Sequence, residues 1–108
     1  MGPLNNVLAF DDVRDLFEKA LARIEEGGNG IRVRLGTRGA AIRLRHRMNK
    51  FRATDRKANA KVYPEDDPNH NASIYDTLQL RIPPEESPDS TTLIIERRSS
   101  DMYEVEDL

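Results

Sequence analysis

The sequence predicts a small α+β domain. We expect a three-stranded, largely antiparallel sheet with two helices on one face, in the order α-β-α-β-β. Two long stretches carry apolar residues at helical spacing, and three short stretches alternate apolar and polar residues. Segments rich in glycine or proline separate them. The chain has 108 residues, the length of one domain. We expect this domain to span residues 1–98 and an acidic C-terminal tail to follow at 99–108.

The first element is a predicted helix that ends at Gly27 and Gly28, because glycine readily adopts the left-handed conformation that terminates helices. Asp11 and Asp12 are expected near its start, where carboxylates cap free N–H groups and interact favourably with the helix dipole. Its apolar residues recur at helical spacing and predict a face that packs on the core: Phe10, Val13, Leu16, Phe17, Ala20, Leu21 and Ile24.

The segment 31–35 (IRVRL) alternates strictly between apolar and basic residues, which predicts a strand with one face on the core. The other face of this strand would carry Arg32 and Arg34. Gly36 ends the strand, and the Thr37 side chain can cap the element that follows.

Residues 38 to about 59 contain no proline and one glycine, and we expect a single long helix here. At about 100° per residue, its apolar residues form one stripe of core-facing width: Ala40, Ala41, Leu44, Met48, Phe51 and Ala58. Asp55 falls on this stripe, whereas Ile42 lies away from it.

The last third of the chain predicts a loop and two strands. Residues 63–72 are rich in Pro, Asp and Asn, which is typical of a loop. The segment Ile74–Ile82 alternates, and its solvent face would carry Tyr75, Thr77, Gln79 and Arg81. Pro83 and Pro84 end this strand, and Thr92–Arg98 predicts the third strand.

This order of elements loosely resembles that of winged-helix domains, which have a helix, a short strand, two more helices and a hairpin wing. The resemblance implies a hairpin formed by the last two strands. The chain departs from it in two ways: one long helix stands where winged-helix domains have two, and residues rich in proline and acids fill the wing. The analogy concerns the fold alone.

Charge is distributed unevenly along the chain. The formal net charge is −2, but residues 27–62 contain eleven Lys/Arg and one acid, whereas residues 1–26 have a net charge of −3 and residues 63–108 one of −9. Such asymmetry is typical of proteins that bind nucleic acid or a membrane surface. The structural alternative is that the acidic ends fold over the basic middle.

The predicted second helix carries most of these basic residues, in two rows. One row consists of residues spaced seven apart: Arg43, Lys50 and Lys57. The other consists of Arg38, Arg45, Arg52 and Arg56. Like charges at such spacings repel, so a bound polyanion would offset a repulsion that the fold alone does not favour. Guanidinium groups also bind phosphate oxygens in bidentate fashion.

We therefore expect a nucleic-acid-binding protein, with DNA favoured over RNA, that contacts phosphates with little sequence specificity. Its candidate binding residues are Arg32, Arg34, Arg38, Arg43, Arg45, Arg47, Asn49, Lys50, Arg52, Arg56 and Lys57. Among them, an asparagine side chain could read adenine in a major groove.

The alternative is a protein–protein interaction module, either a small regulator or an assembly component, with an acidic partner. Ile42 and the apolar residues of the acidic tail favour this reading, because a surface that binds only phosphates does not need them. The tail itself could engage a protein partner or compete with nucleic acid for the basic helix.

No catalytic residue, metal site or cofactor is expected, because His46 and His70 are far apart and the chain has no cysteine. Asp76 and Glu96 leave a metal-dependent nuclease as a third alternative. No apolar run approaches the ~20 residues that a membrane span requires. The lack of cysteine and of a signal peptide leads us to expect a cytoplasmic protein.

Overall fold

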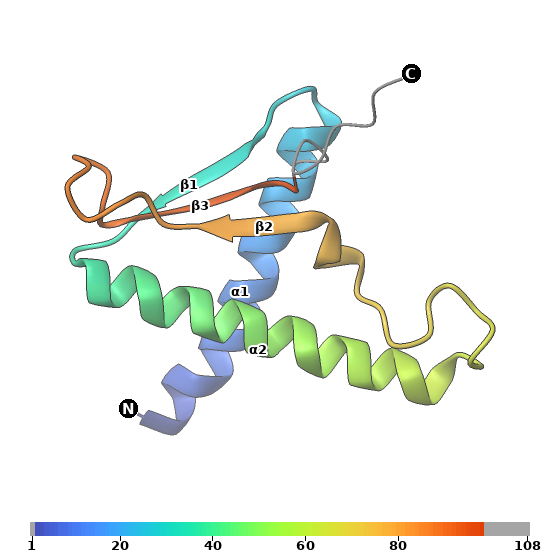
Figure 1. Cartoon of the computed structure of the whole chain (residues 1–108). Helices are drawn as coiled ribbons and strands as arrows, with labels where there is room; N and C mark the ends of the chain where they lie inside the picture. Colours follow the sequence, from blue (N-terminus) through green and yellow to red (C-terminus); the bar gives the residue numbers. More distant parts are fainter. Residues whose placement is uncertain (1, 99–108) are drawn as a thin grey trace, which may run out of the picture.

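The structure is a computed structural model that describes residues 2–98, with side chains described from residue 12 onward. Its elements follow the predicted α-β-α-β-β order, with one added 3-10 turn (Figure 1). They are α1 (Gly2–Glu25), β1 (Gly30–Arg34), α2 (Arg38–Val62), η1 (Ile74–Thr77), β2 (Leu78–Arg81) and β3 (Thr92–Arg97). The predicted tail at 99–108 lies outside the described residues.

The three strands form one antiparallel sheet in the order β1-β3-β2, so β3 is central. Ile31 of β1 lies opposite Ile95 of β3, which lies opposite Leu80 of β2. Residues opposite one another share a face of the sheet, so alternate positions build an apolar face. The predicted antiparallel sheet is thus confirmed.

Both helices cover this apolar face, as the alternation predicts. One cluster of buried residues joins the two helices to the sheet: Val13, Phe17, Ala20, Leu44, Met48, Tyr75, Leu78, Leu93 and Ile95. The two helices cross one another beneath the sheet (Figure 1). Neither described helix covers the opposite face of the sheet, called here the outer face.

Helix α1 begins at Gly2, well before the predicted start at Asp11 and Asp12. Both aspartates therefore lie inside the helix, and their predicted capping role is wrong. Pro3 is tolerated in a first turn because the N–H group it lacks would have no partner there. No residue between Leu4 and Asp11 breaks a helix, so nothing local stops α1 from extending upstream.

The segment predicted as a strand from Ile74 opens instead with the 3-10 turn η1. A capping box explains the difference: the Ser73 hydroxyl accepts from the Tyr75 N–H, and the Asp76 carboxylate accepts from the Ser73 N–H at 3.0 Å. Tyr75 consequently turns inward, 6% exposed, and stacks on Phe17 with ring centroids 4.8 Å apart. Its predicted place on the solvent face of the sheet is wrong.

Helix α2 ends at Val62, three residues beyond the predicted end, where the Tyr63 N–H bonds the carbonyl oxygen of Asn59. Its apolar stripe packs as predicted through Ala41, Leu44 and Met48, but Ala58 is exposed. The C-terminal part of α2 therefore projects beyond the sheet, toward the loop at 63–72 (Figure 1).

Candidate nucleic-acid interface

Helix α2 presents its two basic rows to different surroundings. At 100° per residue, Lys50 lies 160° around the helix from Met48, at the centre of the buried stripe. Its row therefore faces away from the core. The row of Arg52 borders the stripe on the side of β2 and η1. The structure thus separates two sets of bases that the sequence presents as equivalent.

The outward face of α2 is basic along its length. We define the outward row as the six exposed basic residues Arg43, His46, Arg47, Lys50, Lys57 and Lys61. Asp55, the one acid in α2, lies toward the core side and is half-buried. Within residues 12–98, no member of the row forms a hydrogen bond or an ion pair. At 1.5 Å per residue, the row extends over about 27 Å.

Neighbours in the outward row repel one another. Arg43 and Arg47, His46 and Lys50, and Lys57 and Lys61 are each four residues apart. Such like-charge pairs destabilise an isolated helix by about 0.2–0.5 kcal/mol each when both groups are charged. A bound polyanion would remove this repulsion. Lys61 belongs to the row because α2 continues past its predicted end near residue 59 and reaches Val62.

Arg52 serves the fold rather than the surface. It is 7% exposed, and its Nη1 donates to the carbonyl oxygens of Leu78 at 2.6 Å and Tyr75 at 3.1 Å. Its Nη2 donates to Asn49 Oδ1 at 2.6 Å, and the guanidinium lies over the Phe17 ring. Burial lowers its pKa below the ordinary value, and the charge of Asp76 opposes that shift. The group stays charged, but it is committed to four partners inside the protein.

We define the flanking row as the row that borders the buried stripe: Arg38, Arg45, Arg52 and Arg56. Like Arg52, Arg38 and Arg56 are engaged within the molecule. Arg38 Nη1 donates to the carbonyl oxygens of Pro83 at 2.6 Å and Ser90 at 3.3 Å, so it holds the loop between β2 and β3. Arg56 forms an ion pair with Asp76 at 2.6 Å. Arg45 is half-buried and has no ion pair within the described part of the chain.

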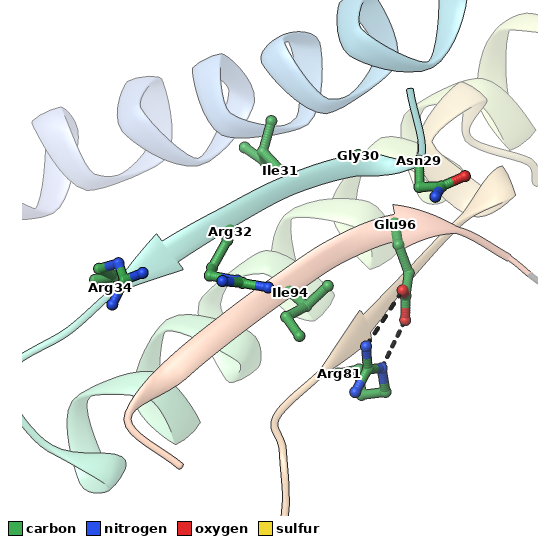
Figure 2. A pocket seen from close by; sticks show the side chains of 8 residues that line it. All are labelled: Asn29, Gly30, Ile31, Arg32, Arg34, Arg81, Ile94 and Glu96. Atoms are coloured by element: carbon green, nitrogen blue, oxygen red, sulfur yellow. Dashed lines mark hydrogen bonds and ion pairs between the residues drawn. The ribbon is translucent and has the colours of Figure 1, made fainter. Parts of the chain in front are cut away.

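The outer face of the sheet carries a shallow basin of about 440 Å³, lined by β1, β3 and Arg81 of β2 (Figure 2). Arg81 Nε and Gln79 Nε2 each donate to Glu96 Oε2 at 2.7 Å. The hydrogen bond from Arg81 is the largest cause of a lowered pKa of Glu96, which burial partly opposes. Arg32 and Arg34 line the same basin, and both are exposed.

Arg32 and Arg34 do not share a surface with the outward row. They lie on the sheet face opposite the helices, whereas the outward row lies on the far side of α2 from the sheet. The sequence predicts one patch because these residues are close along the chain. The structure gives the molecule two separate basic regions.

The acids of the nuclease alternative do not converge. Asp76 bonds Arg56 and the Ser73 backbone, and Glu96 bonds Arg81 and Gln79. Across residues 2–98, no three His, Cys, Asp or Glu side chains are grouped to hold a metal ion. None of the helices in that range combines the length and apolar character needed to cross a bilayer.

The chain matches no protein-family model, and no curated protein or solved structure is significantly similar to it.

Proposed function

We propose that the outward row of α2 binds nucleic acid, with duplex DNA the expected target, by contacting phosphates with little sequence preference. The observation that supports this proposal is the row itself. It consists of six exposed basic side chains on one face of a helix, none of them paired within the described residues and with no acid among them. Phosphate binding would relieve the repulsion within the row. It would also give hydrogen-bond acceptors to side-chain N–H donors that have no partner within the described residues.

Nonspecific contact is favoured over base readout. Asparagine reads adenine with both the oxygen and the nitrogen of its amide. Asn49 Oδ1 already accepts a hydrogen bond from Arg52, and the residue lies on the flanking side of α2. Lysines, which bind phosphate as point charges, make up half of the outward row. These features suit backbone contact.

The shape of α2 is compatible with such contact. A helix with its side chains is about 10–12 Å across, close to the ~12 Å width of a DNA major groove. The C-terminal part of α2 projects beyond the sheet (Figure 1), and both lysines in this part of the helix, Lys57 and Lys61, are exposed. The helix can lie in a groove or along one phosphate strand, and both modes engage the same side chains.

Two double variants with equal charge change test the location of the surface. Lys50→Gln with Lys57→Gln removes two charges from the outward row. Lys19→Gln with Arg23→Gln removes two exposed charges from α1. The ion-pair partners of these two residues, Asp15 and Glu26 respectively, are also exposed. Fluorescence anisotropy with a short duplex at fixed low salt should show about tenfold weaker binding for the first variant, or about 0.7 kcal/mol per lost contact.

The α1 variant should bind within about twofold of the unchanged protein. Equal losses in both variants would show that binding follows net charge alone and would contradict an interface on α2. Each variant's circular dichroism spectrum and unfolding midpoint, compared with those of the unchanged protein, exclude misfolding as the cause.

A further inference from the structure

A small pocket lies between α2 and the edge of β2 that faces away from β3. It has a volume of about 270 Å³ and is lined by Asn49 and Arg52 of α2, by Gln79 and Leu80 of β2, and by Arg98, which follows β3. Among the described residues that line it, none is an acid. It is separate from the basin on the outer face, and no member of the outward row lines it.

The two arginines bring an excess of positive charge to this pocket. Burial is the largest cause of the lowered pKa of Arg52; the charge of Asp76 opposes the shift, and those of Arg98 and Arg56 add to it. Asp76 and Arg56 form an ion pair with one another. Within residues 12–98, Arg98 has no ion pair and is exposed. An anion in the pocket would therefore offset a repulsion between Arg52 and Arg98.

The Arg52 guanidinium is fixed in place and still has donors to offer. Three hydrogen bonds hold it, to the carbonyl oxygens of Leu78 and Tyr75 and to Asn49 Oδ1. A guanidinium group has five N–H donors, so two are left for a ligand. A side chain that is already ordered loses little conformational entropy when it binds. The Asn49 oxygen accepts from Arg52, which leaves the amide nitrogen of Asn49 as a further donor at the pocket.

The backbone of β2 supplies another donor. The Arg98 N–H donates to the Thr77 carbonyl oxygen at 2.8 Å, so the odd-numbered residues of β2 are those bonded to β3. Backbone groups alternate in direction along a strand, and the N–H of Leu80 therefore points away from β3. The Leu78 carbonyl points to the same edge and is bonded there by Arg52. No described strand lies beside this edge.

We propose that this pocket binds a phosphate group. A phosphate monoester carries a charge of about −1.5 to −2 at pH 7 and three acceptor oxygens. This charge matches the two guanidinium groups of Arg52 and Arg98 better than the single charge of a carboxylate does. Guanidinium groups also bind phosphate oxygens in bidentate fashion. The pocket is several times larger than the ~30 Å³ that one water molecule occupies, so a phosphate group fits.

An NMR titration of the full chain with inorganic phosphate at pH 7 tests the proposal, with sodium chloride keeping the ionic strength constant. The signals of the Asn49 side-chain amide and of the Leu80 backbone amide should shift and saturate. The Asn59 side-chain amide donates to the Ala72 carbonyl oxygen away from the pocket, so its signal should not move. Acetate, which carries a single charge, should bind at least tenfold more weakly than phosphate.

Two neighbouring arginines give a matched pair of variants. Arg98→Gln removes one of the two charges of the pocket and should weaken phosphate binding at least fivefold. Arg97→Gln removes the same charge from an exposed residue that does not line the pocket, and binding should stay within twofold of that of the unchanged protein. Both arginines use their backbone N–H groups within the sheet, and glutamine keeps these bonds.

A third variant fills the pocket with charge instead of removing it. Asn49→Asp keeps an oxygen that accepts from Arg52 and places a carboxylate where the phosphate would bind. It should weaken phosphate binding at least tenfold without lowering the unfolding midpoint. No saturable shift at Asn49 and Leu80 in the unchanged chain would overturn the proposal, and so would equal losses in Arg97→Gln and Arg98→Gln.

The source of the phosphate is distinguished by a second measurement on Arg98→Gln. If the variant binds duplex DNA within twofold of the unchanged protein but has lost inorganic phosphate, the ligand is a small phosphorylated molecule. If both are weakened, the pocket takes a phosphate of the nucleic acid. The titration with inorganic phosphate contains no nucleic acid and is followed at residues outside the outward row. A failure of this site is therefore distinct from a failure of the proposed function.

Discussion

The Arg52 guanidinium donates to the carbonyl oxygen of Leu78 at 2.6 Å, which ties the middle of α2 to the first residue of β2. The same Nη1 atom reaches the Tyr75 carbonyl at 3.1 Å. A side chain that looks like one more surface charge in the sequence therefore completes the backbone hydrogen bonding where η1 meets the sheet. Three of the four arginines in the flanking row of α2 form hydrogen bonds or ion pairs within the protein. The residues of the outward row form none within the described part of the chain.

Replacement of Arg52 by alanine should destabilise the protein by about 2–4 kcal/mol. The change leaves the buried Leu78 carbonyl oxygen without a side-chain donor, removes one of the two donors to the Tyr75 carbonyl oxygen, and removes packing on Phe17. Urea unfolding measures this change. Lys50→Ala, at an exposed site of the same helix, should cost less than about 0.5 kcal/mol. Similar costs for the two variants would contradict a structural role for Arg52.

The sequence predicted the elements whose causes are local. Apolar periodicity placed α2 and the core faces of the strands, because burial requires that spacing. The buried role of Arg52 could not be predicted in this way, because the carbonyl groups that it binds lie 23 and 26 residues further along the chain. No helical pattern separates it from Lys50. Tyr75 was misplaced although a signal existed: Ser73 and Asp76 have the spacing of a capping box, which overrode the alternation that followed.

Alkaline pH should weaken the fold through Tyr75. Burial, and then the hydrogen bond from its hydroxyl to Glu18, raise the pKa of Tyr75 to about 12. The folded state thus keeps a proton that the unfolded chain loses near pH 10. This stabilisation is complete below pH 10 and is lost as pH rises through 12. Between pH 8 and pH 11, the stability advantage over Tyr75→Phe should shrink by about 1 kcal/mol. An advantage independent of pH in urea unfolding would contradict the assignment.

Gly30 should not accept a side chain. Its φ is +142°, and a Cβ atom would lie 2.0 Å from the carbonyl oxygen of Ile95 on the neighbouring strand. Gly30→Ala should therefore cost about 2–4 kcal/mol, because β1 must move away from β3. Gly36→Ala, where a Cβ would meet nothing within 4 Å, is the matched control and should change stability by less than about 0.5 kcal/mol. Thermal unfolding of both variants distinguishes the two sites.

The central claim is that the outward row of α2 binds phosphates, and salt dependence tests it most directly. Anisotropy titrations of the unchanged protein against duplex DNA, single-stranded DNA and RNA should be run from about 50 to 200 mM salt. On duplex DNA, the logarithm of the binding constant should fall against the logarithm of salt with a slope between about −3 and −5, because each contacted phosphate contributes about −0.9. Binding that does not change with salt, or no binding to any nucleic acid at the lowest salt, would contradict the claim.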